Sequence, residues 1–99
     1  MSRQDLVKTH GATLSAVASL ATSQTALAAN QYRLGVYAYN TDANACYLKF
    51  GATATTTSFT VKIASDGFWE MPTNVIDTGI MDVICAADGA GSLYLTELS

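Results

Sequence analysis

Apolar and polar residues alternate along residues 58–72, which read SFTVKIASDGFWEMP. A period of two is that of a β-strand with one buried face, so the apolar residues at every second position are expected to face the core. These inward residues are Phe59, Val61 and Ile63. Asp66-Gly67 is typical of a tight turn and predicts a hairpin between this strand and Phe68–Glu70. Pro72 cannot donate to a β-ladder and is expected to end the second strand.

Similar segments, rich in β-branched and aromatic residues, recur on both sides with turn residues about every ten positions. Residues 14–23 fit both a helical and an alternating spacing, and we interpret them as a strand because their neighbours have strand patterns. The other predicted strands are 24–28, 33–40, 45–50, 58–63, 67–71, 79–85 and 93–98. The sequence therefore predicts an all-β fold, a single small antiparallel β-sandwich or barrel of about seven or eight short strands.

The chain has 99 residues, which is the length of one domain, since independent cores generally need about 100 to 150 residues each. Residues 1–13 mix charged, polar and small side chains without a sustained period. We expect them to form an extended N-terminal arm, and residues 14–99 to form the β-sandwich domain.

The chain carries little charge: 13% of its residues are charged, against about 25% in an ordinary soluble domain. The net charge is −3 and basic residues do not cluster, which argues against a nucleic-acid-binding protein. No apolar run reaches the roughly 18 residues of a membrane-spanning helix, so we expect no membrane partner either. A weakly charged outer surface predicts that part of it is covered by neighbouring proteins in an assembly.

Strand periodicity also assigns the faces of the remaining segments. Inward positions are Leu34, Val36, Ala38, Leu93 and Leu95, and outward ones are Arg33, Tyr37, Tyr39, Tyr94 and Thr96. Tyr47 and Lys49 are assigned to the outer face of the next strand. If successive strands pair as a meander, Tyr37, Tyr39 and Tyr47 form an aromatic patch beside two cations. Such a patch suits cross-strand packing on an open sheet, contact with another protein, or stacking on a sugar.

Residues that would support catalysis are few. Cys46 and Cys85 alternate with apolar residues and are expected in the core, either as reduced thiols or joined in a disulfide. His10 is the single histidine, which leaves a triad or a zinc site without its partners. Most aspartates lie in or near turns, where capping is their usual role. We therefore expect no enzyme activity, no metal and no cofactor.

Many segments from residue 23 onward resemble the small β-rich virion proteins of tailed bacteriophages. The segments that carry the resemblance are residues 23–30, 33–35, 39–40, 47–51, 58–63, 67–72, 78–80, 87–89 and 96–98. The resemblance covers about three quarters of the chain and leaves residues 1–13 outside. Some proteins of that group resemble head decoration or cement proteins, which sit on the capsid lattice.

The resemblance implies a structural protein on the capsid surface of a virion, synthesised in the host cytoplasm, that stabilises the head. Its expected partners are the major capsid protein, copies of itself, or both, in a homo-oligomer such as a trimer. The expected interface residues are Leu6, Val7, Leu14, Tyr37, Tyr39 and Tyr47. Alternative hypotheses are a tail, neck or fibre component of the virion, and a carbohydrate-binding module for host adsorption.

Overall fold

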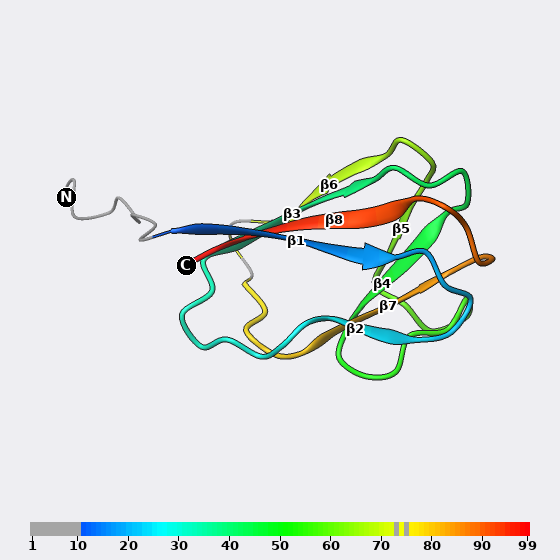
Figure 1. Ribbon diagram of the computed structural model, residues 1–99. Helices are drawn as coiled ribbons and strands as arrows, with labels where there is room; N and C mark the ends of the chain where they lie inside the picture. Colours follow the sequence, from blue (N-terminus) through cyan, green and yellow to red (C-terminus); the bar gives the residue numbers. More distant parts are fainter. Residues whose placement is uncertain (1–10, 73, 75) are drawn as a thin grey trace, which may run out of the picture.

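The computed structural model describes residues 11–72, 74 and 76–99, which form eight β-strands (Figure 1). The strands are β1 (Ala12–Ala18), β2 (Gln24–Leu27), β3 (Gly35–Asn40), β4 (Cys46–Phe50), β5 (Val61–Ile63), β6 (Phe68–Glu70), β7 (Met81–Cys85) and β8 (Ser92–Leu98). Each predicted strand is present, most of them shortened by a few residues. Strand β1 begins at Ala12, and the part of the predicted arm before residue 11 lies outside the described residues.

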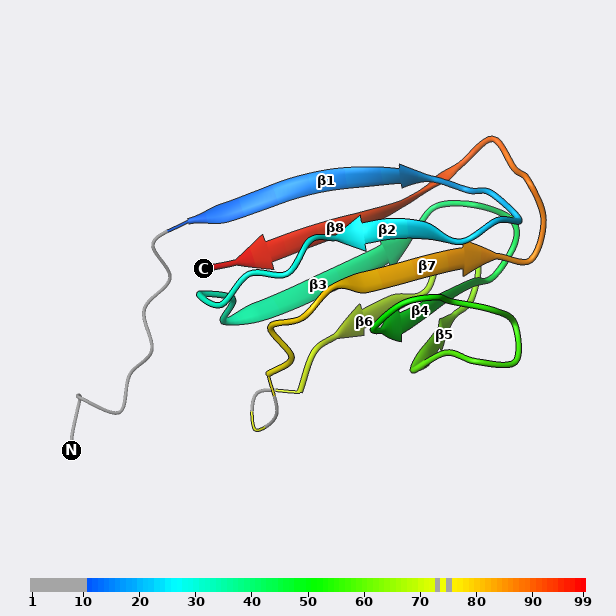
Figure 2. The same cartoon turned by 90° about the horizontal axis from the view of Figure 1, so that it is seen from below.

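The strands form two four-stranded sheets that pack face to face (Figures 1 and 2). Sheet A has the order β1-β8-β3-β6, and sheet B has the order β2-β7-β4-β5. All pairs between these strands are antiparallel. The prediction of an all-β antiparallel fold is confirmed, and of its two architectures the structure adopts the sandwich.

Consecutive strands mostly lie in different sheets. Among the described strands, β4 and β5 are the consecutive pair that stays in one sheet, and the remaining connections cross the sandwich. Strand β3 pairs with β6 and β8, whereas β4 pairs with β5 and β7. The predicted meander of β3 and β4 is therefore wrong, because the turn between them leads the chain from one sheet to the other.

The turn at Asp66-Gly67 is present, but it does not close a hairpin. Asp66 has a φ of 58°, and the amide of Gly67 donates to the carbonyl of Ala64 at 2.8 Å. Strand β5, which precedes the turn, belongs to sheet B, and β6, which follows it, belongs to sheet A. The local turn chemistry was predicted correctly, whereas the pairing of the two flanking strands was not.

The core lies between the inner faces of the two sheets. Its fully buried members include Val36, Ala38, Leu48, Met81, Val83, Leu93 and Leu95. Trp69 is half-buried and its ring meets that of Phe50 across the sandwich, at 5.8 Å between centroids. Phe59 was predicted to face the core and is instead 41% exposed, because β5 begins only at Val61 and the preceding loop turns Phe59 outward.

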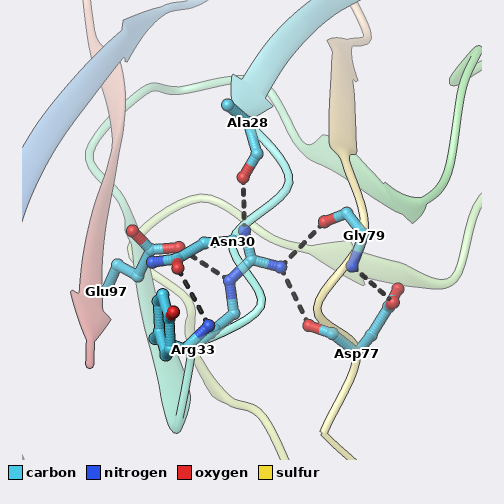
Figure 3. A network of polar contacts seen from close by, with 7 residues as sticks. Ala28, Asn30, Arg33, Asp77, Gly79 and Glu97 are labelled. Atoms are coloured by element: carbon cyan, nitrogen blue, oxygen red, sulfur yellow. Dashed lines mark hydrogen bonds and ion pairs between the residues drawn. The ribbon is translucent and has the colours of Figure 1, made fainter.

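One end of the sandwich is held by a buried arginine (Figure 3). The Nε of Arg33 donates to Oε2 of Glu97 on β8 at 2.7 Å. Its Nη1 donates to the carbonyls of Asp77 and Gly79, both at 2.8 Å, and its Nη2 to the carbonyl of Ala28 at 2.7 Å. The Arg33 cluster, as we name these five residues, ties the β2–β3 and β6–β7 connections to β8.

Arg33 was predicted to be an outward cation beside the tyrosines, and this prediction is wrong. Strand β3 begins at Gly35, so the alternation that assigned Arg33 outward does not extend to it. The side chain instead fills the end of the sandwich, where its donors bind carbonyls of the two partly buried connections.

The opposite end is held by a buried carboxylate, Asp42, in the β3–β4 turn. Its oxygens accept hydrogen bonds from the amides of Asn44 at 2.9 Å and Gly91 at 2.8 Å. The Ser19 hydroxyl, from the β1–β2 connection, donates at 2.9 Å, and the Asn44 side-chain amide donates at 3.0 Å. The Asp42 cluster (Ser19, Asp42, Asn44 and Gly91) thus joins three connections that cross between the sheets.

The Asp42 cluster should make stability depend on acid pH. Hydrogen bonds from the amides of Asn44 and Gly91, reinforced by Ser19, lower the pKa of Asp42 from 3.8 to about 2 despite its burial. A carboxyl whose pKa is lower in the folded state stabilises the fold above its unfolded pKa, and that stabilisation disappears as the pH falls. We therefore expect the urea midpoint to be insensitive to this group above pH 3.8 and to fall as the pH drops toward 2.

Asp42→Asn tests this dependence. The side-chain NH₂ group of the new asparagine cannot accept a hydrogen bond, so it would face the backbone amide of Asn44 or Gly91 without bonding to it. We expect the variant to be less stable at pH 7 and to lose less stability on acidification than the unmodified protein. Asp66→Asn is the matched control, since Asn tolerates a positive φ and Asp66 is exposed. Equal acid dependence in the unmodified protein and Asp42→Asn would contradict the assignment.

Candidate functional site

Sheet A presents a row of aromatic side chains on its outer face. Tyr39 of β3 lies opposite Tyr94 of β8 on one side and opposite Phe68 of β6 on the other. Tyr37 lies two residues along β3 and its ring stands 5.9 Å from that of Phe68. These residues come together because β3 lies between β8 and β6 in the sheet. Residues that lie opposite each other on neighbouring strands point to the same face, so the side chains opposite Tyr39 also point outward.

Leu14 on β1 extends this surface toward the edge of the sheet. It lies opposite Thr96, which in turn lies opposite Tyr37. Leu14 and Phe68 are 65% and 64% exposed, and the three tyrosines are between 36% and 42% exposed. We call this surface the aromatic face; it consists of Leu14, Tyr37, Tyr39, Phe68 and Tyr94.

The charges near the aromatic face are acidic. Glu70 lies on the outer side of β6 opposite Tyr37, and Asp66 accepts a 3.4 Å hydrogen bond from the Tyr39 hydroxyl. The cations of the described residues lie elsewhere, because Arg33 is buried and Lys49 and Lys62 belong to sheet B. The predicted pair of cations beside the tyrosines is therefore wrong. A partner of this face would meet large apolar rings with acidic groups at one side.

The outer face of sheet B differs because the chain itself covers part of it (Figure 1). Lys49 donates to the carbonyl of Thr53 at 3.3 Å and to the Ser58 hydroxyl at 2.8 Å, which holds the β4–β5 connection against the sheet. Ala54 in this connection is buried. Tyr47 packs edge-on against Phe59 at 4.9 Å between centroids. Sheet A has no such cover among the described residues.

The predicted interface residues separate into three groups. Tyr37, Tyr39 and Leu14 lie together on the outer face of sheet A. Tyr47 lies on sheet B and does not join them, because β3 and β4 belong to different sheets. Leu6 and Val7 lie outside the described residues.

Phe68 and Tyr94 complete the aromatic face but were absent from the predicted interface. Alternation placed Tyr94 outward, and that orientation is confirmed. The sequence gives no signal that Tyr94 and Phe68 are neighbours of Tyr39, since three strands distant in the chain contribute them. Only the order of strands in sheet A brings them together.

The two cysteines face each other in the core of sheet B. Cys46 and Cys85 are paired across β4 and β7, and both are buried, as their alternation predicted. Of the two states left open by the sequence, the structure has them as free thiols. The amide of Ala86 donates to the carbonyl of Ala45, so the cysteines occupy a non-hydrogen-bonded pair, where side chains approach most closely. The Cys46 thiol donates to Cys85 and is buried, and both effects raise the pKa of Cys46.

Among the described residues, His, Cys, Asp and Glu do not gather in groups of three that could hold a metal ion. The same part of the chain contains no helix that is long and apolar enough to cross a membrane. Comparison of the chain with protein-family models, curated proteins and solved structures finds no match.

Proposed function

We propose that this chain is a structural protein of a phage virion, a decoration or cement protein that binds the outer capsid lattice through its aromatic face. The observation that carries the proposal is the uncovered row Tyr94–Tyr39–Phe68, flanked by Tyr37 and Leu14. Exposed apolar surface of this kind typically marks a contact with another macromolecule. The resemblance of the sequence to small phage virion proteins supports the choice of a capsid partner.

The composition of the face suits a protein partner. Tyrosine and phenylalanine bury a large area for little loss of side-chain freedom and are frequent at the centres of interfaces. The acidic groups Glu70 and Asp66 at its margin favour a partner patch that is apolar at its centre and basic at its edge. Rigid strands carry every residue of the face, so binding needs little reordering of the chain.

The proposed role is mechanical. A module that contacts two neighbouring capsid subunits makes their separation more costly, and its repetition over a symmetric shell multiplies weak individual contacts. The role needs no catalytic group, metal or cofactor.

Tyr39→Ala should remove the centre of the face and weaken binding to capsids of the encoding phage by at least about tenfold, as for an interface hot spot. Cosedimentation with the capsids measures the affinity. Tyr32→Ala is the matched control: Tyr32 is 71% exposed but lies in the β2–β3 connection, outside the strands that carry the face, so its loss should leave binding unchanged. Equal effects of the two substitutions would contradict the assignment of the face.

Copy number in purified particles distinguishes this role from the other virion roles. A decoration protein is present in proportion to the major capsid protein, whereas a tail, neck or fibre component is far rarer. Absence of the chain from the particles would overturn the proposal. Saturable binding on a glycan array that Tyr39→Ala abolishes would instead support the carbohydrate-binding alternative.

A further inference from the structure

The two sheets have four edge strands, and three of these are protected against pairing with another chain. Strands β5 and β6 have three residues each and carry Lys62 and Glu70. Strand β2 has four residues and is interrupted by a bulge between Thr25 and Leu27. Short length, charge and bulges are the devices by which proteins prevent edge-to-edge association.

Strand β1, the fourth edge, has none of these devices. Its seven residues, ATLSAVA, include no charge, no glycine and no proline. It pairs with β8 in a regular register along its whole length, without a bulge. A long, regular and uncharged edge of this kind is a template for a further strand.

The register shows which backbone groups of β1 point away from the sheet. Gly11 and Ser99 exchange backbone hydrogen bonds, so odd-numbered residues of β1 bond to β8 and even-numbered ones point outward. The carbonyl of Ala18 accepts a hydrogen bond from the Gln24 side chain at 2.8 Å, which closes the edge at that end. The backbone N–H and C=O groups of Ala12, Leu14 and Ala16 also point outward, and among the described residues no strand lies beside them.

We propose that β1 pairs with β1 of a second copy of this chain, antiparallel about a two-fold axis at Leu14. Because the outward backbone groups belong to Ala12, Leu14 and Ala16, this register uses all of them. Leu14 lies opposite Leu14 of the second copy, and Ala12 lies opposite Ala16. The interface is isologous, as in most two-fold dimers.

The side chains of β1 suit this register on both faces of the sheet. On the outer face, two 65% exposed Leu14 side chains cover each other between small alanines. On the inner face, the Ser15 hydroxyl is buried and has no hydrogen-bond partner among the described residues. Thr13 is exposed in the single copy and lies opposite Ser15 of the second copy. Cross-strand Thr–Ser pairs form hydrogen bonds, so the second copy would supply the missing partner of Ser15 once its covered hydroxyl rotates toward the strand edge.

Pairing of two copies would join their A sheets into one continuous sheet of eight strands and place both aromatic faces on the same side. Formation of this dimer does not depend on what the aromatic face contacts. If the proposed function holds as well, a dimer would present two lattice-binding surfaces and could bridge two subunits.

Leu14→Lys tests the dimer, because it places like charges opposite each other at the two-fold axis. We expect the unmodified full chain to dimerise with increasing concentration in sedimentation equilibrium, and Leu14→Lys to weaken the association by at least about tenfold. Phe68→Lys is the matched control, since Phe68 has the same exposure, 64%, on the same face but lies on the β6 edge. It should dimerise like the unmodified chain.

Amide hydrogen exchange locates the contact. At concentrations that favour the dimer, the amides of Ala12, Leu14 and Ala16 should become protected, whereas Thr13 and Ser15, which bond to β8, are protected at all concentrations. A monomer at all concentrations, a trimer, or exchange at Leu14 that does not change with concentration would overturn the proposal. Loss of the dimer on deletion of residues 1–10 would also overturn the proposal. In that case residues 1–10 of the second copy, and not its β1, would pair with the β1 edge.

Discussion

Replacement of Arg33 by methionine is expected to lower the free energy of unfolding by about 3–5 kcal/mol, as when one partner of a buried ion pair is removed. Methionine fills a similar volume but cannot donate hydrogen bonds. The Glu97 carboxylate, whose side chain is 17% exposed, then loses its counter-charge. The partly buried carbonyl contacts to Ala28, Asp77 and Gly79 lose their donors as well. Urea denaturation at neutral pH measures the change.

Lys62→Met is the control for removal of a positive charge. Lys62 is exposed and stands 5.8 Å from the Tyr47 ring, a contact worth about 0.5–1 kcal/mol. If Arg33→Met proves too unstable to purify, Glu97→Gln keeps an acceptor for the Arg33 Nε and should cost less. A loss no larger than that of Lys62→Met would contradict a structural role of the Arg33 cluster.

Gly91→Ala is expected to destabilise the fold by about 1–3 kcal/mol, the usual cost of forcing extra volume into a packed site. A Cβ at this position would lie 2.5 Å from the Cα of Asp42 and 2.8 Å from its backbone nitrogen. Backbone atoms cannot turn aside as a flexible side chain can, so the β7–β8 connection must move away from Asp42. That movement also lengthens the 2.8 Å hydrogen bond from the Gly91 amide to the carboxylate.

Two comparisons make the Gly91 result specific. Gly11→Ala should be nearly neutral, because a Cβ there meets no atom of the described residues within 4 Å. Gly91→Ala should also weaken the dependence of stability on acid pH, since it removes one of the hydrogen bonds that lower the pKa of Asp42. Stability equal to that of Gly11→Ala would show that the loop adapts without cost.

Local pattern was sufficient to locate the strands and most of their faces. The period of two identified Leu93 and Leu95 as core residues and Tyr37 and Tyr39 as outward ones. The pattern failed at strand ends, where alternation stops being informative. Phe59 and Arg33 both lie just before a strand begins, and each was assigned to the wrong face.

The pairing of strands was not accessible from the sequence, and this determined what could be predicted of the aromatic face. A turn such as Asp66-Gly67 suits a hairpin and a crossing between sheets equally well, because its dihedral angles fix only the local direction of the chain. The grouping of Tyr39 with Phe68 and Tyr94 depends on contacts between distant segments. The same holds for the Asp42 cluster, since Asp42 reaches Gly91 across 49 positions of sequence.

The pairing of β1 with β8 also bears on when the protein can fold during its synthesis. Strand β8 lies between β1 and β3, so sheet A lacks an inner strand until residues 92–98 have been made. Up to that point β1 leaves the ribosome with both of its edges unpaired among the described strands. Contacts between segments so distant in sequence form slowly, because the entropy of closing the long loop is lost before the contacts form. Sheet A therefore assembles only after β8 has been translated. Until then β1, which carries no charge, is exposed to pairing with other chains, and the nascent chain can aggregate through it.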